Sequence, residues 1–321
     1  MKISLPVLLF FSLSINLFSQ NIDKPNMSLR ELKQNFDITQ LSDSLMDSFT
    51  IEKSTKILKN LDAKIDDYTI INQRNDSLKV DTSLTIDKYY KLNYLRDDNF
   101  ELIEFSNTGH TYNTLSFVDR DNLFPGIGSS AKHYNYMQAN DIDYYHVATP
   151  FTELMYRTAF VQGQLLDALF SVNTSPRFNF TIARKGLRSL GNYQHFLSSS
   201  SNFRFSTNYN SKNSKYFLKT HYVSQNLFSE ENGGIREDDI VNFESGNTEF
   251  IDRSVFDPQF ENADNTLQGK RFYINQEYSF KNLTDSLNTK KWSIGNIISL
   301  ENKYYQFKQT SPNLYFGESL D

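Results

Sequence analysis

The charged residues that could do chemistry form one acidic set and one basic set. Residues 226–268 carry eleven acids but only two bases, Arg236 and Arg253. Five acids near the start of this stretch are candidates for a constriction loop inside a channel: Glu230, Glu231, Glu237, Asp238 and Asp239. Five bases at strand positions predicted to face inward are candidate pore-lining residues: Arg157, Arg177, Arg204, Lys219 and Arg271. A ring of acids facing bases inside a pore would set its ion selectivity.

Two other interpretations of the acidic stretch stay open. Runs of charge usually face water, so residues 226–268 could be a solvated surface loop. Clustered carboxylates also suit Ca²⁺, although no interval in the stretch matches an EF-hand. On this basis we predict neither a metal nor a cofactor.

Enzymatic chemistry has little support in the sequence. The five histidines are scattered, with no i, i+4 pair of the kind that a helical zinc site needs: His110, His133, His146, His195 and His221. His195 lies near the serines of 198–201, but a Gly-x-Ser-x-Gly turn is absent. Gly126 and Gly128 lack the lysine of a phosphate loop. The protein is therefore predicted not to be an enzyme.

Composition narrows the class of protein. The 321 residues include no cysteine, which excludes a disulfide framework and a thiol nucleophile. The net charge is −5 with acids and bases interspersed, so nothing indicates a nucleic-acid partner. There are 19 Tyr and 27 Phe, yet the mean hydropathy is −0.55. A polar, aromatic chain of this kind suits either a soluble β-protein or a transmembrane barrel, in which alternate residues face water and lipid.

The first nineteen residues are predicted to be a secretory signal peptide. Lys2 provides the positive charge, residues 3–18 are largely apolar, and Ser19 is a small residue at the expected cleavage point. The alternative is a transmembrane anchor, but a membrane-spanning helix needs roughly 20 apolar residues, and Asn16 interrupts this run. Residues 20–80 are polar and are predicted to be a periplasmic extension, partly helical or disordered.

Strands are predicted from alternating polarity. Phe203, Phe205, Thr207 and Tyr209 alternate with Asn202, Arg204, Ser206 and Asn208. Similar alternation occurs in 166–172, 177–182, 269–280 and 292–301. The runs last about as long as the roughly 9–11 residues of a strand that crosses a bilayer, whereas soluble strands average roughly 5–6. Short polar connections alternate with longer ones, although a tight link at 162–164 departs from this pattern.

Several segments resemble the "Putative porin" family of Bacteroidota. They are KYYKLNYLRDDNFEL at 88–102, AKHYNYM at 131–137, TPFTEL at 149–154, GQLLDA at 163–168, KGLRSLG at 185–191 and FESGN at 243–247. The resemblance covers about residues 80–310 and implies an outer-membrane barrel of roughly twice this length. Residues 314–316 begin another strand just before the chain stops, which fits a barrel that continues. The family brings no catalytic residues with it.

The predicted fold is therefore all-β: an antiparallel transmembrane β-barrel, incomplete in this chain, that occupies residues 81–321 and bears a long acidic loop at 226–268. A soluble β-sandwich is the alternative. The predicted function is an outer-membrane porin-like channel for passive diffusion of small solutes. The second hypothesis is a plugged barrel that docks partners and has no channel activity. Expected partners are outer-membrane lipid, the barrel-assembly machinery and small solutes.

Overall fold

The computed structural model describes residues 62–83, 85–97, 101–115, 134–159, 163–280 and 292–311. These residues all belong to the compact unit Lys59–Asp321. The predicted signal peptide, most of the polar extension and the final strand at 314–316 lie outside the described residues. No helix in the described ranges has the length and apolar character needed to span a membrane.

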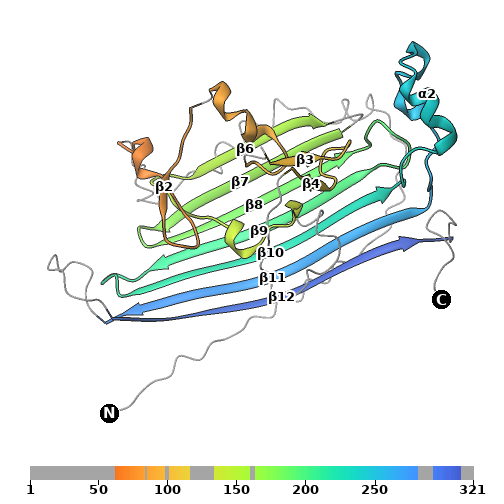
Figure 1. Ribbon diagram of the computed structural model, residues 1–321. Helices are drawn as coiled ribbons and strands as arrows, with labels where there is room; N and C mark the ends of the chain where they lie inside the picture. The colour runs from red at the N-terminus through yellow and green to blue at the C-terminus, as the bar shows by residue number, and fades with distance from the viewer. Residues whose placement is uncertain are drawn as a thin grey trace, which may run out of the picture. The chain divides into compact units, whose positions relative to one another are not determined.

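Seven long strands form the main sheet (Figure 1). They are β6 (Phe151–Ala159), β7 (Gly163–Ser175), β8 (Phe178–Ser189), β9 (Ser198–Asn210), β10 (Tyr216–Glu231), β11 (Ala263–Ser279) and β12 (Ser293–Gln309). Each strand pairs antiparallel with its neighbour in the sequence, so the strand order is β12-β11-β10-β9-β8-β7-β6. The sheet is a simple meander, as predicted for one part of an antiparallel barrel.

The two ends of this sheet carry connections of different length. At one end, here called the short-turn end, residues 176–177 join β7 to β8, and residues 211–215 join β9 to β10. At the other, the long-connection end, residues 190–197 join β8 to β9, and residues 232–262 join β10 to β11. The predicted alternation of short and long connections is thus present between β7 and β11.

The long connection is shorter than its predicted bounds of 226–268. Strands β10 and β11 continue to Glu231 and from Ala263, so they are 16 and 17 residues long. The remaining connection holds the short helices η5 (Glu237–Asp239), α2 (Ile240–Glu244), η6 (Thr248–Phe250) and η7 (Arg253–Val255). An isolated bridge between Ile235 and Pro258 closes its base.

Residues 81–150 were predicted to begin the barrel, but the residues of this stretch that the structure describes do not join the seven-stranded sheet. They form short elements instead: η2 (Ile86–Leu92), the hairpin β3–β4 (Leu102–Glu104 and Tyr112–Thr114) and η4 (Ala139–Asp141). Further on, β5 (Tyr144–His146) pairs with β1 (Thr69–Ile71), which also pairs with β2 (Ser77–Lys79) after η1 (Ile65–Asp67). Three-residue strands cannot cross a bilayer, so the long-strand sheet starts at Phe151.

Side chains alternate between the two faces of the main sheet. On β9, Asn202 and Ser206 are buried on one face, whereas Phe203 is exposed on the other. On β11, Arg271 is buried on the first face and Phe272 is exposed on the second. We call the face of Asn202 and Arg271 the inward wall and the face of Phe203 and Phe272 the outward face. The predicted assignment of polar and apolar faces is therefore confirmed for these strands.

The polar and the apolar face exchange sides along the strands. Towards the short-turn end, the inward wall is polar, with Asn179, Thr181 and Lys219. Towards the long-connection end, the inward wall carries buried apolar residues in two clusters: Met155, Leu165 and Leu187 with Tyr94, and Leu227 and Leu267 with Tyr136. Strands β7 to β12 are thus longer than a bilayer requires. Towards the long-connection end they pack as strands of a water-soluble protein do, with apolar residues buried and polar residues exposed.

Candidate functional site: the inward wall and its covering segment

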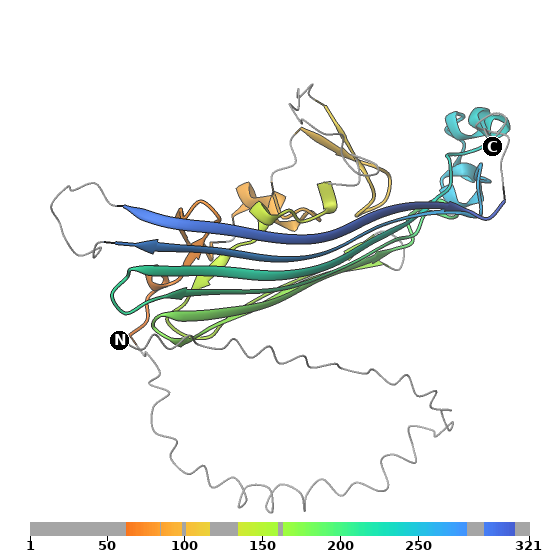
Figure 2. The same ribbon diagram turned by 90° about the horizontal axis from the view of Figure 1, so that it is seen from below.

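The inward wall is covered by the part of the chain that precedes the main sheet. Residues 62–147, here called the covering segment, place their short strands and 3-10 helices on one side of the sheet (Figures 1 and 2). Strand β5 of this segment contacts β7, β8 and β9. The wall and the covering segment form the candidate functional site because a channel would pass along this face.

Tyr94 anchors the covering segment to β8 and β9. Its ring centroid lies 4.1 Å from the Lys185 Nζ, and its hydroxyl lies 2.7 Å from the Ser200 Oγ. The ring also packs in the cluster of Leu165 and Leu187. Burial raises the pKa of the Tyr94 hydroxyl to about 12, so the hydroxyl stays protonated and neutral at physiological pH.

Next to Tyr94, ion pairs join the covering segment to three strands. Arg96 Nη2 lies 2.6 Å from the Glu153 Oε1 on β6, and its Nη1 lies 3.7 Å from the Asp167 Oδ2 on β7. Asp167 also pairs with Arg204 on β9, at 2.9 Å. Two arginines therefore share one half-buried carboxylate, which ties the segment to the wall through a network rather than through one isolated surface pair.

Arg271 holds the covering segment at Met137. Its Nη1 and Nη2 donate to the Met137 carbonyl oxygen at 3.1 and 3.0 Å, and Nη1 lies 3.3 Å from the Glu301 Oε1 on β12. The Tyr136 hydroxyl donates to the same carboxylate oxygen at 2.6 Å. Gly269 makes this contact possible, because a Cβ atom there would overlap the Tyr136 hydroxyl. Arg271 is 2% exposed, and the Glu301 carboxylate compensates its buried charge.

The small sheet β2-β1-β5 rests on the polar part of the wall. Lys219 Nζ donates to the Asn72 carbonyl oxygen at 2.7 Å and to the Asn75 side chain. The Tyr144 hydroxyl lies 2.8 Å from the His221 Nδ1, and the His221 ring stacks on Tyr273 at 4.7 Å. Lys219 and His221 of the wall are thus each hydrogen-bonded to the small sheet, as most buried polar groups in proteins are.

Asn107 fixes the hairpin β3–β4 near the long-connection end. Its Nδ2 donates to the Ser189 and Phe196 carbonyl oxygens at 3.1 and 2.6 Å, and its Oδ1 accepts from the Ser189 hydroxyl at 2.5 Å. Within the hairpin, Glu104 accepts hydrogen bonds from the Gly109 N–H and the Tyr112 hydroxyl. Burial raises the pKa of the Glu104 carboxyl despite these two donors.

Four of the five predicted pore-lining bases lie on the inward wall. Arg204, Lys219 and Arg271 make the contacts described above, and Arg157 Nη1 donates to the Leu92 carbonyl oxygen at 2.7 Å. Each of them therefore contacts the covering segment or the ion-pair network that holds it. The fifth, Arg177, is not on a strand face: it lies exposed in the two-residue turn between β7 and β8. The reason is that Pro176 cannot continue the ladder of strand hydrogen bonds.

The predicted constriction-loop acids fall in two places. Glu230 and Glu231 belong to β10, where they pair with Asp264 and Ala263 of β11. Glu237, Asp238 and Asp239 form the helix η5, at the end of the sheet where β10 and β11 meet their connection (Figure 1). The structure thus places Glu230 and Glu231 at the end of β10 and the other three acids in the connection that follows, not together at a single ring.

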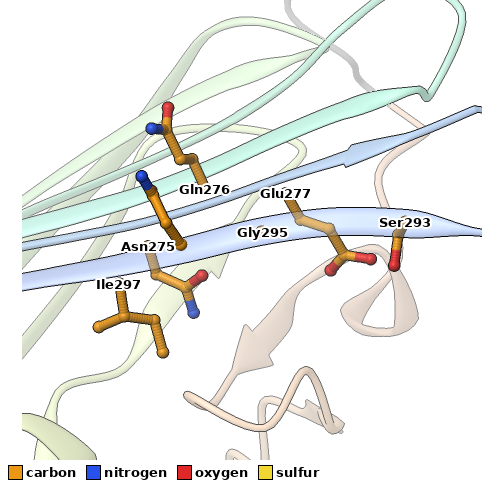
Figure 3. Close-up of a pocket in the computed structure, with 7 residues that line it drawn as sticks. Asn275, Gln276, Glu277, Ser293, Gly295 and Ile297 are labelled. Carbon is orange, nitrogen blue, oxygen red and sulfur yellow. The ribbon is translucent and has the colours of Figure 1, made fainter.

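Part of the inward wall is not covered by the described part of residues 62–147. Between β11 and β12, near the short-turn end, lies an open hollow of ≈ 410 Å³. Figure 3 shows Asn275, Glu277, Ser293 and Ile297 pointing to one side of these strands, and Gln276 to the other. The side chains on the inward side are mostly polar, and Gly295 adds no side chain between them.

The covering segment could not be recognised from the sequence. Its contacts with the wall come from residues spread over 62–147, without a periodic pattern, and they pair with polar wall residues that would suit a water-filled lumen equally well. A partial signal was present: the regular alternation starts only at residue 151, although Tyr-rich runs occur from residue 89. No group of three or more His, Asp or Glu in the described ranges could hold a metal ion.

Comparison with known proteins agrees with this geometry. The family model described as "Putative porin" matches residues 64–321, which include the covering segment as well as the sheet. No curated protein and no solved structure matches the chain. The fold is an antiparallel sheet of an all-β barrel, incomplete over the described residues. The chain belongs to the "Putative porin" family.

Proposed function

We propose that the full-length protein is an outer-membrane channel for passive diffusion of small solutes. One observation carries this proposal: over the same stretch of the strands, towards the short-turn end, the outward face is apolar and the inward wall is polar. Ile274 and Phe272 lie outward on β11, next to the inward Asn275 and Arg271. A strand with lipid on one side and water on the other has this alternation.

The proposed solute path runs along the uncovered part of the wall. The covering segment contacts the wall from β6 to β12, which it reaches through Tyr136 and Glu301, and the hollow between β11 and β12 near the short-turn end is open. Its amide, carboxylate and hydroxyl groups, from Asn275, Glu277 and Ser293, can replace the water of a passing polar solute. The covering segment then narrows the lumen without closing it.

The proposed location is the outer membrane, reached through the signal peptide predicted at residues 1–19, and insertion there would involve the barrel-assembly machinery. The family membership supports this location. The full-length protein should fractionate with outer membranes and resist extraction by alkali. Recovery in the soluble periplasm would contradict the proposal.

Planar-bilayer recording of the full-length protein tests channel activity. Ser293→Trp places a large side chain in the hollow and should lower the conductance by about twofold or more, because pore area limits ion flow. Ile294→Trp is the matched control, since the next residue faces outward, where aromatic side chains are favourable near the membrane surface.

Three outcomes separate the hypotheses. A conductance lowered by the Ser293 variant alone supports a path along β11 and β12. Equal conductance of both variants and the unchanged protein would place the path elsewhere. No conductance in any of them would overturn the channel and favour the plugged, partner-docking barrel, which the family description does not favour.

A further inference from the structure

On strands β8, β10, β11 and β12 the outward face changes from apolar to polar at one row of the sheet. Tyr222, Phe272 and Leu300 are direct neighbours across β10, β11 and β12. Two residues further towards the long-connection end, the row consists of Ser224, Lys270 and Asn302. On β8 the change occurs at the same row, between Ile182 and Arg184. On β9 it comes two residues further along, between Phe203 and Ser201.

Two bases lie on this border. Lys270 stands in the first polar row, and Arg184 lies directly opposite Phe203, which in turn lies opposite Ser224. Both side chains are exposed, and neither forms an ion pair within the described ranges. Arg188 lies on the same face, four residues further along β8. Two outward acids, Glu230 and Asp264, lie opposite each other on β10 and β11, six residues further towards the long-connection end.

We propose that Arg184 and Lys270 bind the phosphate groups of an outer-leaflet lipid headgroup, with Arg188 as a peripheral contact. This inference rests on the proposed outer-membrane location, in which the long-connection end faces the outside. Unpaired bases at the boundary of an apolar face meet the lipid where its acyl chains end and its phosphates begin.

The spacing fits a headgroup with more than one phosphate. Arg184 on β8 and Lys270 on β11 have two strands between them, so their backbones are about 14 Å apart at the usual strand spacing. Phe203 lies between them in the same row, next to the apolar part of the outward face, where it can contact an acyl chain. Arginine and lysine bind phosphate through charge-assisted hydrogen bonds, which are stronger than bonds between neutral groups.

The test is lipid retention by the purified full-length protein in detergent, followed by native mass spectrometry. The probes are a bis-phosphorylated lipid A, the same lipid without phosphates, and phosphatidylglycerol. We expect the unchanged protein to retain the bis-phosphorylated lipid preferentially. Arg184→Gln combined with Lys270→Gln should lower that retention by about tenfold. Arg188→Gln should lower it less.

A matched control removes two bases from the other end of the sheet. Lys212 and Lys215 lie in the turn between β9 and β10, at the short-turn end. Lys212→Gln combined with Lys215→Gln changes the net charge equally and should leave retention of the bis-phosphorylated lipid unchanged. An equal loss in both double variants would show a general charge effect and overturn the proposal.

Failure of this inference can be distinguished from failure of the proposed function. Equal retention of phosphorylated and dephosphorylated lipid, by a protein that still conducts in a planar bilayer, would overturn the phosphate site alone. Equal retention of phosphatidylglycerol would contradict selection of the outer-leaflet headgroup. The conductance of the Arg184 and Lys270 double variant should match that of the unchanged protein, which confirms that the loss of lipid is not due to misfolding.

Discussion

The ammonium of Lys185 lies 4.1 Å from the ring centroid of Tyr94, so a base of the sheet contacts an aromatic ring of the covering segment. Lys185 is 5% exposed, and a cation at that depth needs a partner. Tyr94 supplies one through its ring, and its hydroxyl reaches Ser200 on the next strand. One residue of the segment thus contacts two neighbouring strands.

Replacing Tyr94 should measure this attachment. Tyr94→Phe keeps the ring and loses the bond to Ser200, so it should destabilise the covering segment by about 1 kcal/mol. Tyr94→Ala also removes the ring and should cost about 3–5 kcal/mol. Hydrogen exchange of residues 86–97 in the lipid-embedded protein measures the local effect. Equal exchange in both variants would show that the ring does not hold the segment.

Adjacent residues on β11 should respond oppositely to an added charge. Ile274→Arg places a guanidinium on the outward face and should destabilise by about 2–4 kcal/mol if the site lies near mid-membrane. Asn275→Arg places it in the open hollow and should cost little. Unfolding by urea in lipid vesicles measures both. Equal costs would argue for a soluble sandwich with two buried sides.

Ser206 is a poor control for this experiment, although it faces inward. Its hydroxyl lies 3.3 Å from the Asp143 carbonyl oxygen, and the residue is buried beneath the covering segment. An arginine there would collide with the segment. Alternation alone would suggest that arginine at Ser206 costs little. Because of this burial, we instead expect the substitution to destabilise the protein.

The hairpin β3–β4 should lose stability as the pH rises. Burial raises the pKa of the Glu104 carboxyl in the folded protein above its ordinary value. The stabilisation is therefore complete below the ordinary carboxyl pKa and is lost as the pH rises through the raised pKa. Hydrogen exchange of residues 102–114, corrected for intrinsic rates, should increase across this window. Glu104→Gln should remove the dependence; an unchanged pH profile in that variant would assign it to another group.

The acidic connection is proposed to affect ion selectivity. Neutralising Glu237, Asp238 and Asp239 together should lower the preference for cations, because Glu237 and Asp238 are exposed and Asp239 is partly exposed on the helix η5. Deleting residues 236–257 joins Ile235 directly to Pro258, its partner in the bridge at the base of the connection, and leaves β10 and β11 intact. This deletion should raise conductance if the connection narrows the pore. Unchanged selectivity and conductance in both variants would place the connection outside the ion path.

A reversible lock can show whether the covering segment moves during conduction. The chain has no cysteine, and the side chains of Asn107 and Ser189 touch. Asn107→Cys combined with Ser189→Cys should therefore form a single disulfide under oxidation. We expect the same conductance in the oxidised and reduced protein, since the proposed path runs along β11 and β12. A higher conductance on reduction would mean that the segment leaves the wall to open the pore.

The sequence predicted the faces of the strands more reliably than their ends. Alternation around Phe203 and Phe272 is visible because lipid requires apolar residues on one face. Beyond Lys270 the apolar residues face inward, as Leu267 and Leu227 do. The pattern of apolar outward residues therefore stops before the strands do. This reversal is why the connection was predicted to start at residue 226 rather than 232.

The bases that were predicted to line a pore show a second limit of prediction from sequence. The strand faces of Arg204, Lys219 and Arg271 follow from alternation, but their partners do not. Met137, Asn72 and Asp167 are distant in sequence from the bases they contact, and no local pattern pairs them. Tertiary packing decides whether an inward base faces solvent or another part of the chain.

The border between the rows of Phe272 and Lys270 would also determine how deep the protein sits in a bilayer. A shift outward by one row would bring Tyr222, Phe272 and Leu300 into water, and the opposite shift would draw Lys270 and Arg184 into hydrocarbon. Both displacements cost free energy, so the vertical position has a single minimum. Because Arg271 follows Lys270 directly and holds Met137, the contact between the covering segment and the wall would be held at that same level relative to the membrane surface.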